Sequence, residues 1–424
     1  MNTMTPVLPR VNEALGNGLT LRTPAGLDDV ERVAALASTV FGPEVGPMMQ
    51  TLLMRHPSMT WADQLFVENA AGEVVSALCL IPWTWRYGRA EIAVGEMGVV
   101  ATAVDYRRRG LVRRQVDFFK ARLAERGCVL SIIQGIPFYY RQFGYDYALP
   151  LEGGWRLELR QAPAAPEAGY SLRRATLDDL PALQALYARA VRGLTIYAVR
   201  TPEIWHYLLE PYTTPVADSR QTWVVCAADG AIAGYTRLPE FHFGTELVVD
   251  EASLVSASAG VALLAHLRRQ AEGAGQPFIR LNLPGSNDLV QLARAFGAAS
   301  EGTYSWQIFV PDLAALLRAI APALEDRLAD SLYAGLTRDL RINFYRDGLA
   351  LRFAQGRVQE VTAPAEPGQA DLSLPAWAFV PLVLGHRTLD ELRFAYPDTS
   401  WRGEARLLIE TLFPRGEAFL YTVY

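Results

Sequence analysis

Two stretches of the chain share one pattern of apolar and polar positions. The first starts at Leu21 with a short strand-like run, passes a pair of aspartates at 28–29, and continues with apolar residues every three or four positions as far as Phe41. The second starts at Leu172 and repeats this order through the aspartates at 178–179. Each stretch is predicted to form a strand, an aspartate-rich helix start and an amphipathic helix.

A predicted hairpin follows in both places. Residues 66–75 form strand-like runs around a turn at Gly72, and residues 223–232 do so around Asp229-Gly230. The two elements recur in the same order, roughly 150 to 160 residues apart. The economical explanation is a duplicated α/β domain.

The pattern changes towards the end of the chain. A helical stretch over 312–328 precedes an alternating hairpin over 340–353, which turns at Asp347-Gly348. One more strand is expected at 371–374, and the chain ends in an apolar, strand-like segment at 418–424. These elements predict a small α+β unit.

The length supports this division, because 424 residues at roughly 150 per domain correspond to two or three domains. The Ala/Pro-rich segment 161–166 has the composition of an exposed connector. We therefore predict an α/β (α+β) protein with domains at 1–150, 151–311 and 312–424.

Charge and cysteine usage narrow the function classes. The net charge is −5 and the pI about 5.7, so no basic field is expected to attract nucleic acid or an anionic membrane. The three cysteines are scattered and the five histidines share no metal-ligand spacing, which predicts neither disulfides nor a metal site. The N-terminal segment has no apolar signal-like region, and the longest apolar stretch, 374–384, is too short for a bilayer span. We expect a cytoplasmic protein.

The most informative segment joins a predicted strand at 96–102 to a predicted helix at 111–126. Between them lie three consecutive arginines, 107–109, followed by Gly110. A helix start offers unpaired N–H groups and the positive end of the helix dipole, and glycine permits close approach of a phosphate. Arginines add charge-assisted hydrogen bonds. The segment therefore predicts a phosphate-binding loop, although a solvated basic turn would have the same composition.

This segment resembles the coenzyme A pyrophosphate motif of the GNAT acetyltransferase superfamily, in the form Val-Ala-Thr…Tyr-Arg-Arg-Arg-Gly-Leu. Residues 134–145 resemble the next strand and turn of one subgroup, the Eis-like (enhanced intracellular survival) acetyltransferases. The resemblance implies an active N-terminal GNAT domain, a degenerate second one and a C-terminal domain similar to sterol carrier protein. It also implies a homo-oligomer, with hexamers typical of the family.

The resemblance implies that acetyl-CoA is the donor. It assigns the cofactor contacts to Val100, Ala101, Thr102, Arg108, Arg109, Gly110, Leu111, Val112, Arg113, Gly135 and Ile136. Two positions depart from the family pattern: Val112, where Gly or Ala is usual, and Val104, where proline is frequent. Neither change removes a backbone donor.

The second copy differs from the first in this segment. Its equivalent, 251–261, has a glycine before an apolar helix but no arginine. We therefore expect one cofactor per chain and a catalytically silent second domain.

Acetyl transfer to an amine needs an acid for the departing thiolate, and tyrosine can serve. Four tyrosines crowd the turn after the strand at 129–134, and the sequence alone does not choose between Tyr139 and Tyr140. The family's acid lies three residues before Phe-Gly-Tyr, which corresponds to Tyr140.

The base is open between two groups. In Eis-like enzymes the main-chain carboxylate at the end of the chain takes this role, which corresponds to Tyr424. Glu96 is the competing candidate, because many GNAT enzymes place a glutamate on the strand before the cofactor loop.

The leading hypothesis is an acetyl-CoA-dependent N-acetyltransferase that acts by direct transfer on a primary amine, such as an aminoglycoside, a polyamine or a lysine-like small molecule or peptide. The alternative is a protein that binds a lipid or another apolar ligand through its C-terminal domain, where 377–384 is a strongly apolar helix, with the GNAT domains as a scaffold. A structural protein that retains a fossil coenzyme A site is a third possibility.

Overall fold

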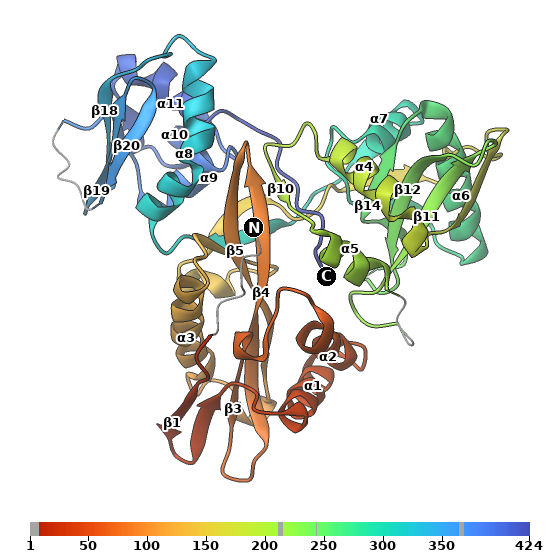
Figure 1. Cartoon of the computed structure of the whole chain (residues 1–424), viewed down its shortest axis with the longest axis horizontal. Helices are drawn as coiled ribbons and strands as arrows, with labels where there is room; N and C mark the ends of the chain where they lie inside the picture. Colours follow the sequence, from red (N-terminus) through yellow and green to blue (C-terminus); the bar gives the residue numbers. More distant parts are fainter. Residues whose placement is uncertain (1–7, 211–214, 243, 364–368) are drawn as a thin grey trace.

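The computed structural model describes residues 8–210, 215–242, 244–363 and 369–424. The fold is mixed α/β, as the sequence predicts, and has three units around four sheets. Figure 1 shows the long strands of the first sheet rising between the second and third units, with the C-terminus at the junction of the first two.

The first sheet has nine strands in the order β1-β2-β3-β4-β5-β6-β17-β7, with β10 paired to β4. Its strands are β1 Asn12–Gly16, β2 Leu19–Arg22, β3 Gln64–Glu68, β4 Val74–Tyr87, β5 Ala90–Thr102, β6 Leu130–Ile133, β7 Asp146–Pro150, β10 Ile196–Ala198 and β17 Ser305–Phe309. Neighbours are antiparallel except for β5 and β6, which run parallel. The predicted hairpin around Gly72 is the β3–β4 pair.

Helices cover both faces of this sheet. Alternate residues of β4 point to opposite sides: Leu78 packs with α3 (Leu111–Glu125), and Cys79 packs with α1 (Leu27–Phe41) and α2 (Val45–Arg55). Val116, Phe119 and Leu123 of α3, with Val112 packed beside them, form the side of the helix that faces the sheet. The short 3-10 turns of this unit are η1 Trp61–Asp63, η2 Val104–Tyr106 and η3 Tyr139–Phe143.

The second unit contains two four-stranded sheets, ordered β14-β12-β11-β9 and β13-β15-β8-β16. Its strands are β8 Trp155–Glu158, β9 Tyr170–Arg174, β11 Arg220–Ala227, β12 Ile232–Pro239, β13 Leu247–Val249, β14 Glu251–Leu254, β15 Phe278–Leu281 and β16 Ala299–Ser300. Its helices are η4 Leu177–Asp179, α4 Leu180–Ala190, α5 Pro202–Leu209, α6 Ala257–Gly273 and α7 Asp288–Ala295. The repeat seen in the sequence is present here as the strand–helix pair β9–α4 and the hairpin β11–β12.

Two strands from this part of the sequence join the first sheet. β10 pairs with β4, and β17 lies between β6 and β7. β17 joins the first sheet because its apolar side chains, Trp306 and Ile308, are buried in the core of the first unit. The domain boundary at residue 311 therefore stays a prediction, since the chain crosses back before it.

The third unit has a five-stranded sheet in the order β20-β19-β18-β21-β22. Its elements are α8 Leu313–Ala329, β18 Arg338–Asn343, β19 Gly348–Ala354, β20 Arg357–Thr362, β21 Leu372–Ser373, α9 Ala376–Val383, α10 Leu389–Ala395, β22 Ser400–Trp401, η5 Gly403–Ala405 and α11 Arg406–Leu412. The predicted hairpin with its Asp-Gly turn is β18–β19. Most apolar side chains of α9 are buried in the core, whereas Trp377 is 58% exposed.

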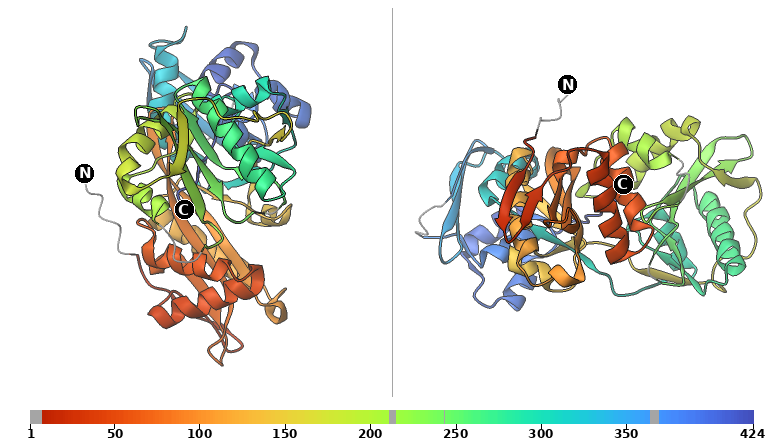
Figure 2. Two further views of the ribbon diagram at one scale, coloured as in Figure 1. Left: turned by 90° about the vertical axis from the view of Figure 1, so that its right-hand side faces the viewer. Right: turned by 90° about the horizontal axis from the view of Figure 1, so that it is seen from below.

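The end of the chain is extended but is not the strand that the sequence predicts. Only Ala418 forms a β-bridge, to Ile196. Further on, the main chain is hydrogen-bonded by a side chain of the second unit and not by a neighbouring strand: Arg200 donates to the main-chain oxygen of Thr422. Figure 2 shows the same end of the chain from two further sides.

All three cysteines are free and buried. No helix in the described part of the chain is long and apolar enough to cross a membrane.

Candidate active site

The first sheet opens between its two parallel strands. β5 and β6 pair only from Val94 opposite Leu130 to Glu96 opposite Ile132. β5 then continues to Thr102 with β4 as its only partner among the described strands. The edge of β5 that faces β6 is therefore unpaired beyond Glu96, and we call this opening the wedge.

A β-bulge accounts for the wedge. Between the paired positions Cys79–Gly98 and Ala77–Ala101, β5 has one residue more than β4. The bulged stretch of β5 contains Val99, whose φ is +46°, an uncommon value for a β-branched residue. A bulge bends its strand and ends regular pairing, which separates β5 from β6.

The wedge leads to an uncapped helix start. Gly110 is the N-cap of α3 with a left-handed conformation (φ +75°), and no side chain in the described part of the chain caps the helix. None of the described groups accepts a hydrogen bond from the backbone N–H groups of Leu111, Val112 and Arg113. These donors and the helix dipole make the site suited to an anion.

The arginines before the helix are free of carboxylate partners. Among the described residues, Arg107, Arg108 and Arg109 form no ion pair. All three are exposed; Arg109 lies 4.6 Å from the ring centre of Tyr106, and Arg107 Nε donates to the Thr102 main-chain oxygen at 3.3 Å. Their charge is available to a ligand.

The β6 side of the wedge carries Gly135 and Tyr140. A Cβ at Gly135 would lie 2.3 Å from the Tyr140 ring, so only glycine lets this ring pack against the backbone. Tyr140 is 6% exposed, burial raises its pKa, and none of the described groups hydrogen-bonds to its hydroxyl. Tyr139 is 37% exposed, and its ring packs edge-on against Tyr140.

The β5 side of the wedge carries Glu96, on the sheet face opposite α3. Glu96 is 2% exposed; Trp83 Nε1 donates to its Oε2 and Tyr424 Oη to its Oε1, both at 2.9 Å. Burial raises the pKa of Glu96 to about 8, although the hydrogen bonds from Tyr424 and Trp83 lower it. Glu96 is thus not an ion-paired surface glutamate.

The end of the chain follows α11 of the third unit and reaches this point along the second unit. The Tyr424 ring packs edge-on against Trp83, with ring centres 6.1 Å apart. The main-chain oxygen of Tyr424 accepts hydrogen bonds from Thr422 Oγ1 at 2.6 Å and from Arg220 Nη1 at 3.2 Å. The structure therefore brings the side chain of Tyr424 to Glu96, whereas Arg220 and Thr422 hold its main-chain oxygen.

The predicted cofactor residues are distributed along the wedge and the helix start. Val100, Ala101 and Thr102 lie on the separated part of β5, and Arg108, Arg109, Gly110, Leu111 and Val112 lie in the loop and the first turn of α3. Arg113 turns towards η3, where it donates to Gln142 Oε1 at 2.9 Å. Ile136, 64% exposed, lies in the loop after β6.

The corresponding region of the second unit is closed. β13 pairs with β15 and β14 with β12, so the strands separate here too. At this split Asn287 Nδ2 donates to the Ala252 main-chain oxygen (2.8 Å) and to Tyr421 Oη (3.4 Å). The following helix, α6, is capped by Ser256. The start of α6 thus has a side-chain cap and no arginine, in contrast to the start of α3.

Sequence reasoning missed the residues that hold the chain end. Arg200 and Arg220 lie more than 200 positions before the residues they contact. No local pattern marks such pairs. The only available signal was the apolar character of the last residues.

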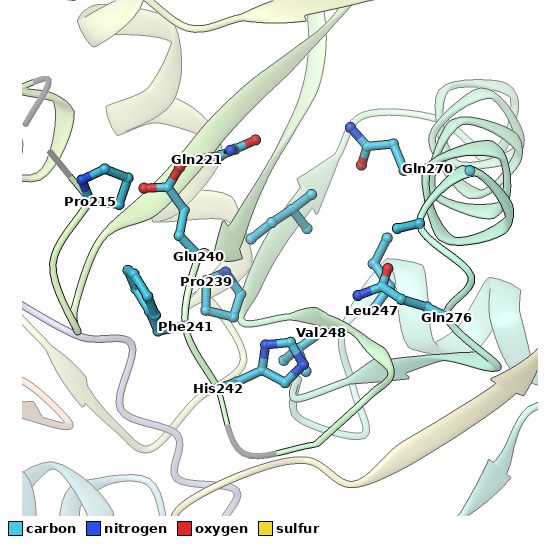
Figure 3. A pocket seen from close by; sticks show the side chains of 13 residues that line it. Pro215, Gln221, Pro239, Glu240, Phe241, His242, Leu247, Val248, Gln270 and Gln276 are labelled. Atoms are coloured by element: carbon cyan, nitrogen blue, oxygen red, sulfur yellow. Dashed lines mark hydrogen bonds between the residues drawn. The ribbon is translucent and has the colours of Figure 1, made fainter. Parts of the chain in front are cut away.

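A separate hollow of about 620 Å³ lies in the second unit, beside the end of β12 (Figure 3). Gln221 donates to the Glu240 carboxylate at 2.9 Å, and His242 and Gln276 both bond to the main-chain oxygen of Glu246. These polar groups already have partners within the protein. Across the described chain there is also no cluster of three or more metal-ligating side chains.

Comparison with known proteins agrees with this geometry. Residues 23–148 match the model of an acetyltransferase (GNAT) domain. None of the curated proteins matches the sequence.

Several solved structures share the fold over nearly the whole chain. A probable N-acyltransferase from Enterococcus faecalis is 14% identical, with a TM-score of 0.71 and coverage of 96% of this chain and 100% of that one. A GCN5-related N-acetyltransferase from Anabaena variabilis is 14% identical (TM-score 0.68; 95% and 99%), and Eis1 from Mycobacterium abscessus is 20% identical (TM-score 0.62; 96% and 100%). The first unit thus matches a GNAT domain, and acyl transfer is the class of reaction that this fold supports.

Proposed function

We propose that the protein is an acetyl-CoA-dependent N-acetyltransferase that transfers the acetyl group directly to a primary amine. The observation that carries the proposal is the wedge between β5 and β6. It ends at a helix start where the described residues provide no cap and no ion-pair partner for the arginines, and its two sides bear Tyr140 and Glu96, the latter in contact with the Tyr424 side chain.

Coenzyme A would bind with its pyrophosphate at the start of α3, where backbone N–H groups and Arg108 and Arg109 supply positive charge. The thioester would lie in the wedge, where the unpaired edge of β5 after Glu96 offers main-chain donors to the carbonyl oxygen. Gly135 keeps the β6 side open to the Tyr140 ring.

In the reaction the amine nitrogen forms a bond to the acetyl carbon and the carbon–sulfur bond breaks. The Tyr424 carboxylate would take the proton from the amine, and the Tyr140 hydroxyl would give its proton to the departing thiolate. A hydroxyl with no protein partner is free to make that transfer. Acceptors in this proposal are polyamines, aminoglycosides and lysine-like amines.

We also propose three domains at 1–150, 151–311 and 312–424, the last one similar to sterol carrier protein, and a homo-oligomer. The burial of most apolar side chains of α9 in the core shared by the first and third units gives no support to the lipid-binding alternative.

The test uses the purified full chain with acetyl-CoA and a panel of spermidine, kanamycin and a lysine-containing peptide. Release of coenzyme A thiol that depends on the amine supports the proposal. Arg109→Glu combined with Gly110→Asp should abolish coenzyme A binding in a calorimetric titration. An unchanged dissociation constant in this variant would remove the loop from the mechanism.

Three variants separate the candidate bases. Deletion of Tyr424 moves the terminal carboxylate, Tyr424→Phe keeps it but removes the bond to Glu96, and Glu96→Gln removes the other carboxylate. We expect deletion to lower kcat by about 10²- to 10⁴-fold and Tyr424→Phe to have a smaller effect. A loss in Glu96→Gln that exceeds the loss on deletion would assign the base to Glu96.

A further inference from the structure

The last residues of the chain are held by arginine side chains of the second unit. Arg200, whose side chain is fully buried, donates to the main-chain oxygen of Thr422 from Nε at 3.0 Å and from Nη2 at 2.6 Å. Two bonds from one guanidinium to one oxygen fix both the position and the direction of that peptide group.

Arg200 is itself held rigidly. Its two Nη atoms bond to the two carboxylate oxygens of Glu251 at 2.7 Å, and Tyr235 Oη also bonds to Glu251. The guanidinium lies 4.5 and 4.8 Å from the ring centres of Tyr187 and Trp205. A charge with this many partners has little freedom to move, so the peptide group it binds is fixed relative to the second unit.

Arg220 holds the final residue in the same way. Its Nε donates to Asp250 at 3.0 Å, and its Nη1 donates to the main-chain oxygens of Asp218 at 2.7 Å and Tyr424 at 3.2 Å. Beyond this contact, the Tyr424 hydroxyl reaches Glu96 at the opening of the wedge. The chain end is therefore anchored by one unit and delivered to the other.

We propose that Arg200 and Arg220 are positioning residues for the acetyl transfer and that the second unit, closed to a cofactor, serves as the socket for the chain end. This inference rests on the proposed function, in which the Tyr424 carboxylate is the base. The closed split supports it, because Tyr421 of the same segment lies there beside Asn287.

The test compares Arg220→Ala with Arg268→Ala in the full-length protein. Arg268 is the matched control, since it also lies in the second unit and bonds to one carboxylate (Glu272, 2.8 Å) and one main-chain oxygen (Ala162, 2.8 Å). We expect faster hydrogen–deuterium exchange at 418–424 in Arg220→Ala but not in Arg268→Ala. Arg200→Ala should have the same effect, and Arg220 keeps the test available if that buried substitution prevents folding.

The kinetic arm uses acetyl-CoA with spermidine, kanamycin and a lysine-containing peptide. Arg220→Ala should lower kcat by about 10- to 100-fold and leave the KM for acetyl-CoA nearly unchanged, because the reacting group is misplaced while the cofactor loop is intact. Arg220→Lys, which keeps the charge and one donor, should recover part of kcat.

The two proposals fail separately. If the wild-type protein does not bind coenzyme A, the proposed function is wrong, whereas the exchange comparison still decides whether the arginines hold the chain end. If the protein is active and Arg220→Ala retains either the exchange protection of 418–424 or the wild-type kcat, the positioning role is wrong.

Discussion

Glu96 is a buried carboxyl group to which the described residues provide no cationic partner, and its protonation is linked to stability. Its pKa is raised from 4.5 to about 8, with burial as the main cause. The fold therefore favours the protonated form, whose contribution to stability is complete below about pH 4.5 and is lost as the pH rises to about 8.

We predict that Glu96→Gln makes the free energy of unfolding less dependent on pH in this range. The difference in slope should approach about 1.4 kcal/mol per pH unit, the value for one proton. Denaturant unfolding at several pH values between 4.5 and 8 measures it. Glu91→Gln is the control, since Glu91 lies on the same strand, is half exposed and pairs with Arg86. Equal slopes in Glu96→Gln and the wild type would contradict the raised pKa.

Tyr140 and Tyr145 offer a second comparison of single residues. Tyr140→Phe removes a hydroxyl with no partner in the described protein, so stability should change by no more than about 0.5 kcal/mol while kcat falls by about 10²- to 10⁴-fold. Tyr145→Phe breaks the 2.7 Å bond to Ser131 Oγ, so it should lose about 1 kcal/mol of stability and keep its kcat. Thermal unfolding and initial rates on both variants decide the matter, and a fully active Tyr140→Phe would rule out Tyr140 as the acid.

At the scale of elements, the starts of α3 and α6 differ: α3 follows three arginines and has no side-chain cap among the described residues, whereas α6 is capped by Ser256. Arg108→Ala combined with Arg109→Ala leaves the helix start of α3 intact but removes two unpaired charges. We expect the dissociation constant for coenzyme A to rise by about 10- to 100-fold. Arg160→Ala with Arg192→Ala makes the same charge change on the exposed surface of the second unit and should leave binding unchanged. If both double variants lost affinity for coenzyme A to a similar degree, the loss would be due to overall charge and not to Arg108 and Arg109 at the helix start.

Periodicity predicted the elements that are formed by local sequence. The hairpins β3–β4, β11–β12 and β18–β19, as well as the helix α3, follow from spacing and turn residues. Periodicity did not predict that β10 and β17 join the first sheet, because strand pairing across long separations leaves no local signal. The bulge at Val99 was equally hidden, since a β-branched residue with positive φ is held there by its surroundings rather than by its own preference.

The residues of the candidate site likewise fall into those that are contiguous in the sequence and those that only the fold brings together. Arg108, Arg109 and Gly110 are contiguous, so the sequence alone indicated them, and the resemblance supplied Tyr140 and Tyr424. The hydrogen bond between the Tyr424 hydroxyl and Glu96 joins residues 328 positions apart, and only the fold reveals that the two residues meet.

At the scale of the whole molecule, the last residues connect two hydrophobic cores. Ala418, Leu420 and Val423 are buried in the core of the first and third units, whereas Phe419 and Tyr421 are buried in the core of the second. From Ala418 to Tyr421 the alternation along an extended segment sends neighbouring side chains to opposite sides, and Val423 departs from this alternation. A third core, which includes α3 and Tyr140, contains no residue of this segment.

Deletion of 417–424 should therefore affect the molecule unevenly. Each buried apolar side chain contributes about 1.5–3 kcal/mol, so we expect faster hydrogen–deuterium exchange in α1 and α2 of the first unit and in α4 and α5 of the second. Exchange in α3 and the affinity for coenzyme A should stay close to wild type, because the core beneath α3 is untouched. The control is deletion of Tyr424 alone, which removes the terminal group but leaves the alternating side chains. Loss of coenzyme A binding in the long deletion would contradict this prediction. It would mean that the cofactor loop depends on the chain end for its structure.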